Sequence, residues 1–221
     1  RKFEFSFDYV IVFTAFIIAA MCHEVAHGYA AYCFGDDTAK REGRLSFNPI
    51  KHIDLKGLLL PILLLLSGTK FLIGWAKPVP VNFNNLRPHR LGFFVVAVAG
   101  ITVNFIFAGI SLILLRTFFH SSYHIFYEDI MVKGSPVTEI IVKFLIYFFF
   151  INILLGTFNL IPITPLDGGR IVYSFAPKSV RNFYDKIENY GIIIVFLLLW
   201  GGLFSNVFVI VFDFLIKLLG G

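Results

Sequence analysis

The sequence predicts an all-α integral membrane protein, and three observations lead to this fold class. Of the 221 residues, 57% are hydrophobic and 15% are charged, whereas soluble domains have about 45–50% apolar and about 25% charged residues. Four long apolar segments each reach the roughly 20 residues that a helix needs to cross a bilayer. The loops between them are short, and the outer loop between Arg116 and Pro136, of about twenty residues, is too small for a folded domain. We therefore expect one membrane-embedded domain over residues 1–221.

Each of the four predicted spans is an apolar run of helical length. They are expected at about Tyr9–Phe34, Leu91–Leu115, Val137–Ile161 and from Gly191 to Phe212. The second and the fourth contain no charged residue. The glycine pair at 201–202 leaves open whether residues 191–219 form one helix or a broken one.

A fifth apolar stretch, Leu58–Leu66, contains Pro61 and is shorter than a spanning helix requires. Whether it spans decides which loops share one side of the membrane. If it spans, the two sides hold nine and ten of the 19 Lys and Arg residues. If it re-enters, thirteen of the 19 lie on one side, which is the bias typical of cytoplasmic loops. We therefore predict a re-entrant segment, with these loops cytoplasmic and both termini on the outer side.

The net charge of +5 is read as this topology signal, so it does not indicate nucleic-acid binding. The partner that the composition predicts is the lipid bilayer. Cys22 and Cys33 fall in the first predicted helix about 16 Å apart, which is too far for a disulfide.

The first span contains His23-Glu24-Val25-Ala26-His27, which has the HExxH pattern of zinc enzymes. On a helix, residues i and i+4 share one face, so both imidazoles can reach one metal ion. Glu24 lies between them, where it can take a proton from water. Ionisable side chains inside an apolar span are costly and indicate a functional site. We favour a metal site over the alternative, a buried structural hydrogen-bond cluster.

Catalytic zinc typically has three protein ligands, and Asp167 is the candidate for the third. It follows Pro162 and Pro165, which should end the third helix, and it precedes two glycines that permit a tight turn. The alternative is an ordinary turn aspartate in a Pro/Gly loop. With the re-entrant topology, Asp167 and the HExxH residues face the same side of the membrane and can share one zinc ion per chain. With an additional span they would face opposite sides.

Asn104 lies within the second span, four residues after Gly100. Its amide either makes an interhelical hydrogen bond among small packing residues or stabilises the oxyanion of a reaction, and the residues alone leave both open. The segment Lys77–Asn82 alternates Pro and Val and cannot be helical. This short extended stretch either holds an unwound substrate by strand addition or only connects to the second span.

Three motifs together resemble the site-2 protease family of intramembrane zinc metalloproteases: HEVAH at 23–27, GITVN at 100–104 and NLIPITPLDGG at 159–169. Their order and spacing cover the whole chain, and the run GWAKPVPVN at 74–82 resembles the compact members without PDZ or CBS domains. The resemblance implies zinc ligands His23, His27 and Asp167, with Glu24 as catalytic base and a catalytic role for Asn104. It also implies a site that opens toward the cytoplasm and membrane-anchored protein substrates.

We therefore predict an intramembrane zinc endopeptidase of the cell inner membrane, active in regulated intramembrane proteolysis. The alternative is a polytopic transporter or metal permease that uses the same His/Glu/Asp cluster as an ion path. Against it stands the absence of the repeat halves that transporters have. The sequence leaves open the substrate, the cleaved bond, the trigger, and whether a regulatory partner or a homo-oligomer is involved.

Overall fold

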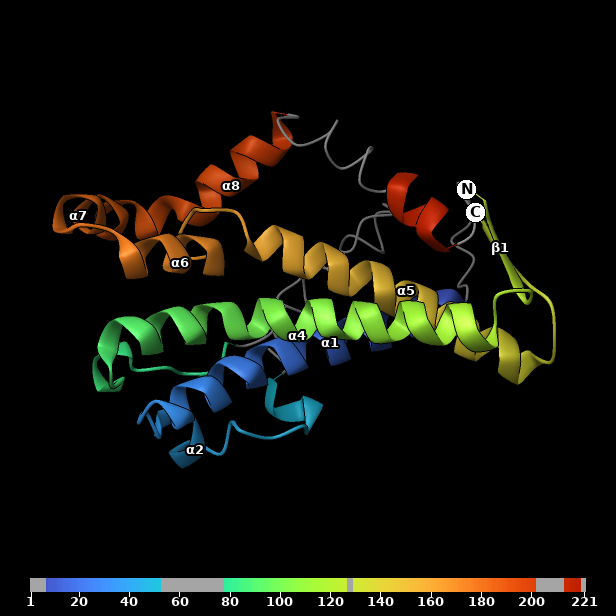
Figure 1. Ribbon diagram of the computed structural model, residues 1–221, viewed down its shortest axis with the longest axis horizontal. Helices are drawn as coiled ribbons and strands as arrows, with labels where there is room; N and C mark the ends of the chain where they lie inside the picture. The colour runs from blue at the N-terminus through green and yellow to red at the C-terminus, as the bar shows by residue number, and fades with distance from the viewer. Residues whose placement is uncertain (1–6, 53–77, 127–128, 202–212, 220–221) are drawn as a thin grey trace. The chain divides into compact units, whose positions relative to one another are not determined.

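The computed structural model describes residues 7–52, 78–126, 129–201 and 213–219 of the chain. The chain divides into two compact units, Arg1–Asn104 and Phe105–Gly221. Helix α4 (His89–Phe118) contributes its first half to one unit and its second half to the other. Figure 1 shows the elements in chain order. The predicted re-entrant stretch Leu58–Leu66 lies outside the described residues.

The first unit is built on helix α1 (Phe7–Cys33) and the first half of α4. The short elements α2 (Thr38–Arg41), η1 (Pro49–His52) and η2 (Phe83–Asn85) lie between them in the chain. A small core of Ala31, Leu86 and Val96 joins the end of α1 to the start of α4. Gly35 follows α1 with a φ of 98°, a value that a residue with a side chain rarely adopts, and it turns the chain out of the helix.

Hydrogen bonds to the Asp36 carboxylate hold the extended segment before α4 against the end of α1. This carboxylate is completely buried and accepts hydrogen bonds from the Asn82 backbone N–H at 2.7 Å and from the Asn85 side chain at 2.9 Å. Burial alone would raise the pKa of Asp36, but these bonds and those from Thr38 outweigh it, so the pKa lies below its ordinary value. The backbone N–H of Arg87 also donates to the Phe34 carbonyl at 2.8 Å.

The second unit contains most of the remaining elements. After α4 come the antiparallel strands β1 (Tyr123–Phe126) and β2 (Asp129–Val132), paired so that Tyr123 lies opposite Val132. Helices α5 (Pro136–Asn159), α6 (Asp167–Phe175) and α7 (Lys178–Ile187) follow, then η3 (Glu188–Tyr190) and α8 (Gly191–Trp200). Residues 213–219 are helical.

Packing in the second unit joins α4, α5 and the chain's last helical residues. Its core includes Leu115 of α4, with Ile146 and Phe149 of α5. The buried Tyr123 hydroxyl donates to the Leu219 carbonyl at 2.6 Å. Ser135 caps α5, since its hydroxyl accepts from the Thr138 backbone N–H at 3.2 Å. These contacts connect the β-hairpin with the helices on either side of it in the chain.

The predicted all-α membrane class is confirmed. In the described part of the chain, α1, α4 and α5 are long and apolar enough to cross a membrane, and their bounds lie within a few residues of the predicted spans. Of the fourth predicted span, α8 ends at Trp200, directly before the glycine pair, and residues 202–212 lie outside the described part. The β1–β2 hairpin was not predicted.

Candidate metal centre

Two histidines on one face of α1 form the centre of the candidate site. His23 and His27 are separated by one helical turn and are both buried, at 7% and 6% exposure. Their Nε2 atoms lie 3.0 Å apart, and their rings are nearly perpendicular, at 83° with centroids 4.6 Å apart. The HExxH spacing therefore brings the two imidazole nitrogens to one point, as the sequence predicted.

Helix α4 supplies an acceptor for the other nitrogen of each imidazole. His23 Nδ1 lies 2.6 Å from Oδ1 of Asn104, and His27 Nδ1 lies 2.7 Å from the carbonyl oxygen of Val96. A carbonyl oxygen only accepts, so His27 Nδ1 is the donor, and in the neutral ring Nε2 then carries the lone pair. The same argument holds for His23 with the amide oxygen of Asn104. Both Nε2 atoms are thus in the form that binds a metal.

Gly100 leaves the space that the two rings occupy. A Cβ atom built on this residue would lie 2.6 Å from both His23 Cε1 and His27 Nε2. Real Cβ contacts are not this close, so any larger residue here would displace the imidazoles. The glycine of the GITVN motif therefore has a direct steric role at the site.

Glu24 is half-buried on α1 and contacts the extended segment that precedes α4. Its Oε2 accepts a hydrogen bond from the Val79 backbone N–H at 2.8 Å. A Cβ on Gly28 would lie 2.8 Å from Val79 Cγ1, so the segment also packs directly on α1 beside His27. The Pro/Val stretch that the sequence predicted to be extended is thus in contact with the predicted base.

Asp167 is the first residue of α6 and is buried, at 4% exposure. The loop before it packs closely on the helix start: a Cβ on Gly168 would lie 2.3 Å from the Leu160 carbonyl oxygen, and one on Gly169 would lie 2.3 Å from the Thr164 nitrogen. The two glycines are required by this close backbone approach. Helix α5 ends at Asn159, before Pro162 and Pro165, as expected.

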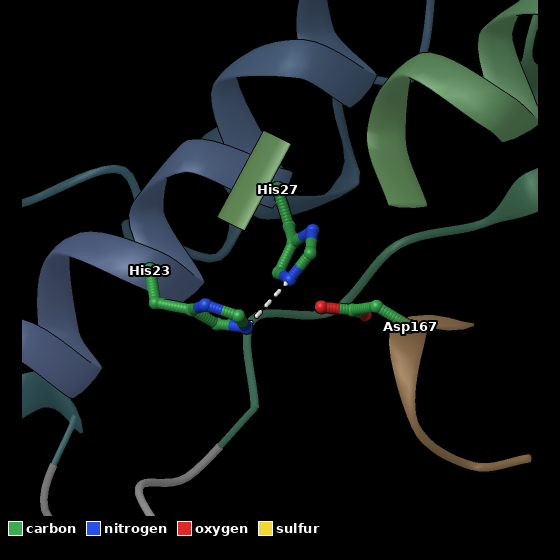
Figure 2. A group of neighbouring side chains, drawn as sticks. All are labelled: His23, His27 and Asp167. Carbon is green, nitrogen blue, oxygen red and sulfur yellow. Dashed lines mark hydrogen bonds between the residues drawn. The ribbon is translucent and has the colours of Figure 1, made fainter. Parts of the chain in front are cut away.

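The structure brings together the three predicted ligands His23, His27 and Asp167. One ligand atom from each residue lies within 4.8 Å of the others, and all three residues are buried. Figure 2 shows the two imidazoles and the carboxylate directed toward one another.

This group has the donor chemistry of a zinc site. Two imidazole nitrogens and one carboxylate oxygen form a common ligand set of catalytic zinc, with zinc–ligand distances of about 2.0–2.2 Å. In tetrahedral geometry, two such nitrogens are roughly 3.3 Å apart, close to the 3.0 Å between the Nε2 atoms. Two buried nitrogens that both present lone pairs at this distance repel each other, and a cation between them removes the repulsion. The residues therefore fit zinc.

Two contributors to the site were missed by the analysis of the sequence. Val96 acts through its backbone carbonyl, for which the sequence carries no side-chain signal. Asp36 holds the segment that contacts Glu24, and its position two residues before Thr38 is a signal for a local side-chain turn. Asn159, the first residue of the NLIPITPLDGG motif, donates from its side chain to the Leu155 carbonyl of its own helix at 3.0 Å.

Comparison with known proteins relates the whole site region to one family. The family model described as Peptidase family M50 matches residues 11–202, which include every predicted site residue. No solved structure matches the chain closely enough to count as a relative.

Three curated relatives are similar over most of the chain. A candidate zinc metalloprotease of Bacillus subtilis, YwhC, is 40% identical over 184 residues, which are 83% of this chain and 77% of that protein. A candidate zinc metalloprotease of Mycolicibacterium smegmatis is 25% identical over 86% of this chain and 67% of its own length. A zinc metalloprotease of Methanocaldococcus jannaschii is 28% identical over 79% of this chain, but only 37% of that longer protein is matched.

Proposed function

Because this chain belongs to peptidase family M50, we propose that it is a zinc endopeptidase that hydrolyses peptide bonds of membrane-anchored proteins at a site within the membrane. It is a membrane protein and a metalloprotease of this family. The observation that carries the proposal is the buried group His23, His27 and Asp167, whose ligand atoms lie within 4.8 Å of one another. Its two histidines belong to a helix apolar enough to span a bilayer.

Three of the chain's residues would hold the metal, and a fourth would move the proton. Zinc, when bound by His23, His27 and Asp167, supplies Lewis-acid chemistry: it polarises the scissile carbonyl and lowers the pKa of a water molecule. Glu24 takes the proton from the attacking water and then donates it to the leaving amine. The Val79 N–H holds Oε2 of Glu24 at 2.8 Å, which fixes the carboxylate and leaves Oε1 to accept the proton.

Several finer features belong to the same proposal. We infer one zinc ion per chain, since one group of three ligands accounts for the predicted site residues. The bias of thirteen of the 19 Lys and Arg residues supports a chain in the cell inner membrane, with the site toward the cytoplasm. The substrates would be membrane-anchored proteins, and cleavage would release their soluble parts.

The transporter alternative is less well supported. The match to a peptidase family and the names of the relatives favour proteolysis. A conducting path also gives no reason for the Glu24 carboxylate to be held by a backbone N–H between two metal-binding histidines.

The test compares the chain with its Glu24→Gln variant in the membranes of the same cells. Glutamine keeps the size of the side chain but cannot take a proton from water. New N-termini inside or next to the spans of membrane-anchored proteins, detected by mass spectrometry, should appear only with the unchanged chain. Both proteins should contain the same amount of zinc. If both proteins held zinc and gave identical sets of N-termini, endopeptidase activity would be ruled out.

A further inference from the structure

We propose that one face of helix α4, formed by Val96, Gly100 and Asn104, fixes the tautomer and the ring position of both histidines before any metal binds. The proposal rests on the assignment of His23 and His27 as zinc ligands. It makes Asn104 a positioning residue that acts on zinc through His23. This differs from the oxyanion role considered from the sequence, in which Asn104 would contact the substrate.

The spacing along the two helices places these groups opposite each other. Val96, Gly100 and Asn104 are four residues apart, so they lie on one face of α4. His23 contacts Asn104 and His27 contacts Val96, so α1 and α4 run antiparallel along this contact. Gly100 lies between the two acceptors, at the level of both rings.

The acceptors on α4 decide which nitrogen of each imidazole carries the proton. A neutral imidazole can hold its proton on either nitrogen. At the observed 3.0 Å between the Nε2 atoms, a proton on one of them would form a hydrogen bond to the other and block the metal. The Asn104 amide oxygen at 2.6 Å and the Val96 carbonyl at 2.7 Å favour protonated Nδ1 in both rings instead. The metal-binding form is thus selected by the protein.

The burial of Asn104 supports a positioning role, because a polar side chain inside an apolar helix is stable only when it is hydrogen-bonded. Asn104 is completely buried in a helix apolar enough to span the bilayer. Burying an amide without hydrogen bonds is unfavourable, and the short contact with His23 offsets this cost. Partners that orient a metal-binding histidine typically change metal affinity by about 10–100-fold when they are removed.

The experiment uses the full chain with Glu24→Gln in detergent, so that turnover cannot influence the result. Zinc affinity is measured by competition with a fluorescent zinc chelator, and the imidazole ¹⁵N signals of the metal-free protein report the tautomers. Asn104→Ala should lower zinc affinity about 10–100-fold and alter the His23 signals. His27, whose acceptor is a backbone carbonyl, should keep its Nδ1 proton and serves as the internal control.

Asn104→Asp separates positioning from oxyanion stabilisation. Aspartate keeps an acceptor oxygen for His23 but has no N–H groups to donate to an oxyanion, so it should restore zinc affinity to within a few-fold of the parent. Thr102→Ala, an exposed position on the same helix, should leave affinity unchanged. The space that Gly100 leaves for the two imidazoles is tested by the same zinc competition. Gly100→Ala should weaken zinc binding. Gly109→Ala, where a Cβ meets nothing within 4 Å, is the control and should not.

Parental zinc affinity in Asn104→Ala would overturn the inference, and so would an Asn104→Asp protein that binds zinc as weakly as Asn104→Ala. Protonated Nε2 of His23 in the metal-free parent would overturn it as well. A parent that binds no zinc at all would instead contradict the proposed function, and the ¹⁵N signals would still decide the tautomers. Because the Gly100 and Asn104 variants test the same face of α4 by different means, a variant that fails to fold does not remove the test.

Discussion

The backbone N–H of Val79 donates a hydrogen bond to Oε2 of Glu24 over 2.8 Å. This contact joins the proposed base on α1 to an extended segment more than fifty residues later in the chain. Since the donor is a backbone group, only a change that removes the N–H can break the bond. The Val79 side chain makes a second contact with α1 that does not depend on this hydrogen bond, because it packs against the helix at Gly28.

We therefore predict that Val79→Pro impairs cleavage and leaves zinc content unchanged. A hydrogen bond to a charged group contributes about 1.5–3 kcal/mol, so kcat/KM should fall about tenfold or more. Val79→Ala retains the N–H and loses only side-chain packing, so it is the matched control. Its kcat/KM should be clearly higher than that of Val79→Pro. Cleavage of a membrane-anchored substrate in proteoliposomes measures both. Equal activity of the two variants would show that the hydrogen bond does not orient Glu24.

The three proposed ligands give a prediction for metal content. The His23→Ala, His27→Ala and Asp167→Ala proteins should each lose most of the roughly one zinc ion per chain that the parent holds, because catalytic zinc depends on three protein ligands. Asp185→Ala, which removes an exposed aspartate on α7, is the control for Asp167 and should retain zinc. Metal analysis by mass spectrometry after purification decides the outcome. Full zinc occupancy in Asp167→Ala would remove Asp167 from the site.

Asp36 gives a prediction for stability and its dependence on pH. The pKa of this carboxyl is below its ordinary value because of the hydrogen bonds that it accepts. The ordinary value, about 3.9, applies to the unfolded chain. The charged carboxylate therefore stabilises the folded protein above about pH 4, and this contribution is lost as the pH falls through the folded-state pKa.

Asp36→Asn should accordingly lower the melting temperature of the metal-free protein at pH 7, by roughly 2–8 °C. The difference from the parent should shrink below about pH 4. The neighbouring Asp37 is exposed and forms a surface ion pair with Arg41, so Asp37→Asn should have little effect. Thermal unfolding in detergent, followed by circular dichroism, measures all three proteins. If the melting temperatures of the parent and of Asp36→Asn differed by the same amount at low pH as at pH 7, the charge of Asp36 would not stabilise the fold.

The sequence predicted the parts of the molecule that depend on side-chain pattern. Apolar runs of about 20 residues marked α1, α4 and α5, because the cost of burying polar groups in lipid leaves no other solution. The i,i+4 spacing of His23 and His27 predicted their convergence, because it follows from helix geometry alone. The prolines after α5 placed its end correctly, and the glycines after Asp167 predicted the close turn at the start of α6.

Other features could not be predicted because they depend on backbone groups or on tertiary contacts. The acceptor for His27 is the Val96 carbonyl, and the donor to Glu24 is the Val79 N–H. Every residue has such groups, so no residue type reveals them. The β1–β2 hairpin was missed because each strand has only four residues, too few for a clear alternation. The contact between Asn104 and His23, on which the proposed positioning role rests, is a tertiary contact that the sequence does not reveal.

The last prediction concerns topology. The backbone N–H of Arg87 donates to the carbonyl of Phe34 at 2.8 Å, so the end of α1 and the start of α4 lie on the same side of the membrane. If α1 and α4 both span, the chain between them crosses the membrane an even number of times or not at all, as the predicted re-entrant segment at Leu58–Leu66 requires. Helix α4 has 30 residues, about 45 Å of helix, which is long enough to cross a bilayer, so we expect its two ends on opposite sides.

Single cysteines in a Cys22→Ala, Cys33→Ala background test this with a membrane-impermeant thiol reagent applied to intact cells. Lys51, Arg87 and Lys186 are exposed positions predicted to be cytoplasmic, and Ser121 and Lys133 are exposed positions predicted to be outside. The first three cysteines should react only after the cells are opened, and the last two should react in intact cells. Labelling of 51 and 87 on opposite sides would mean that the chain crosses the membrane between them. His27 and Asp167 would then face opposite sides, and a zinc ion shared by these two residues would be excluded.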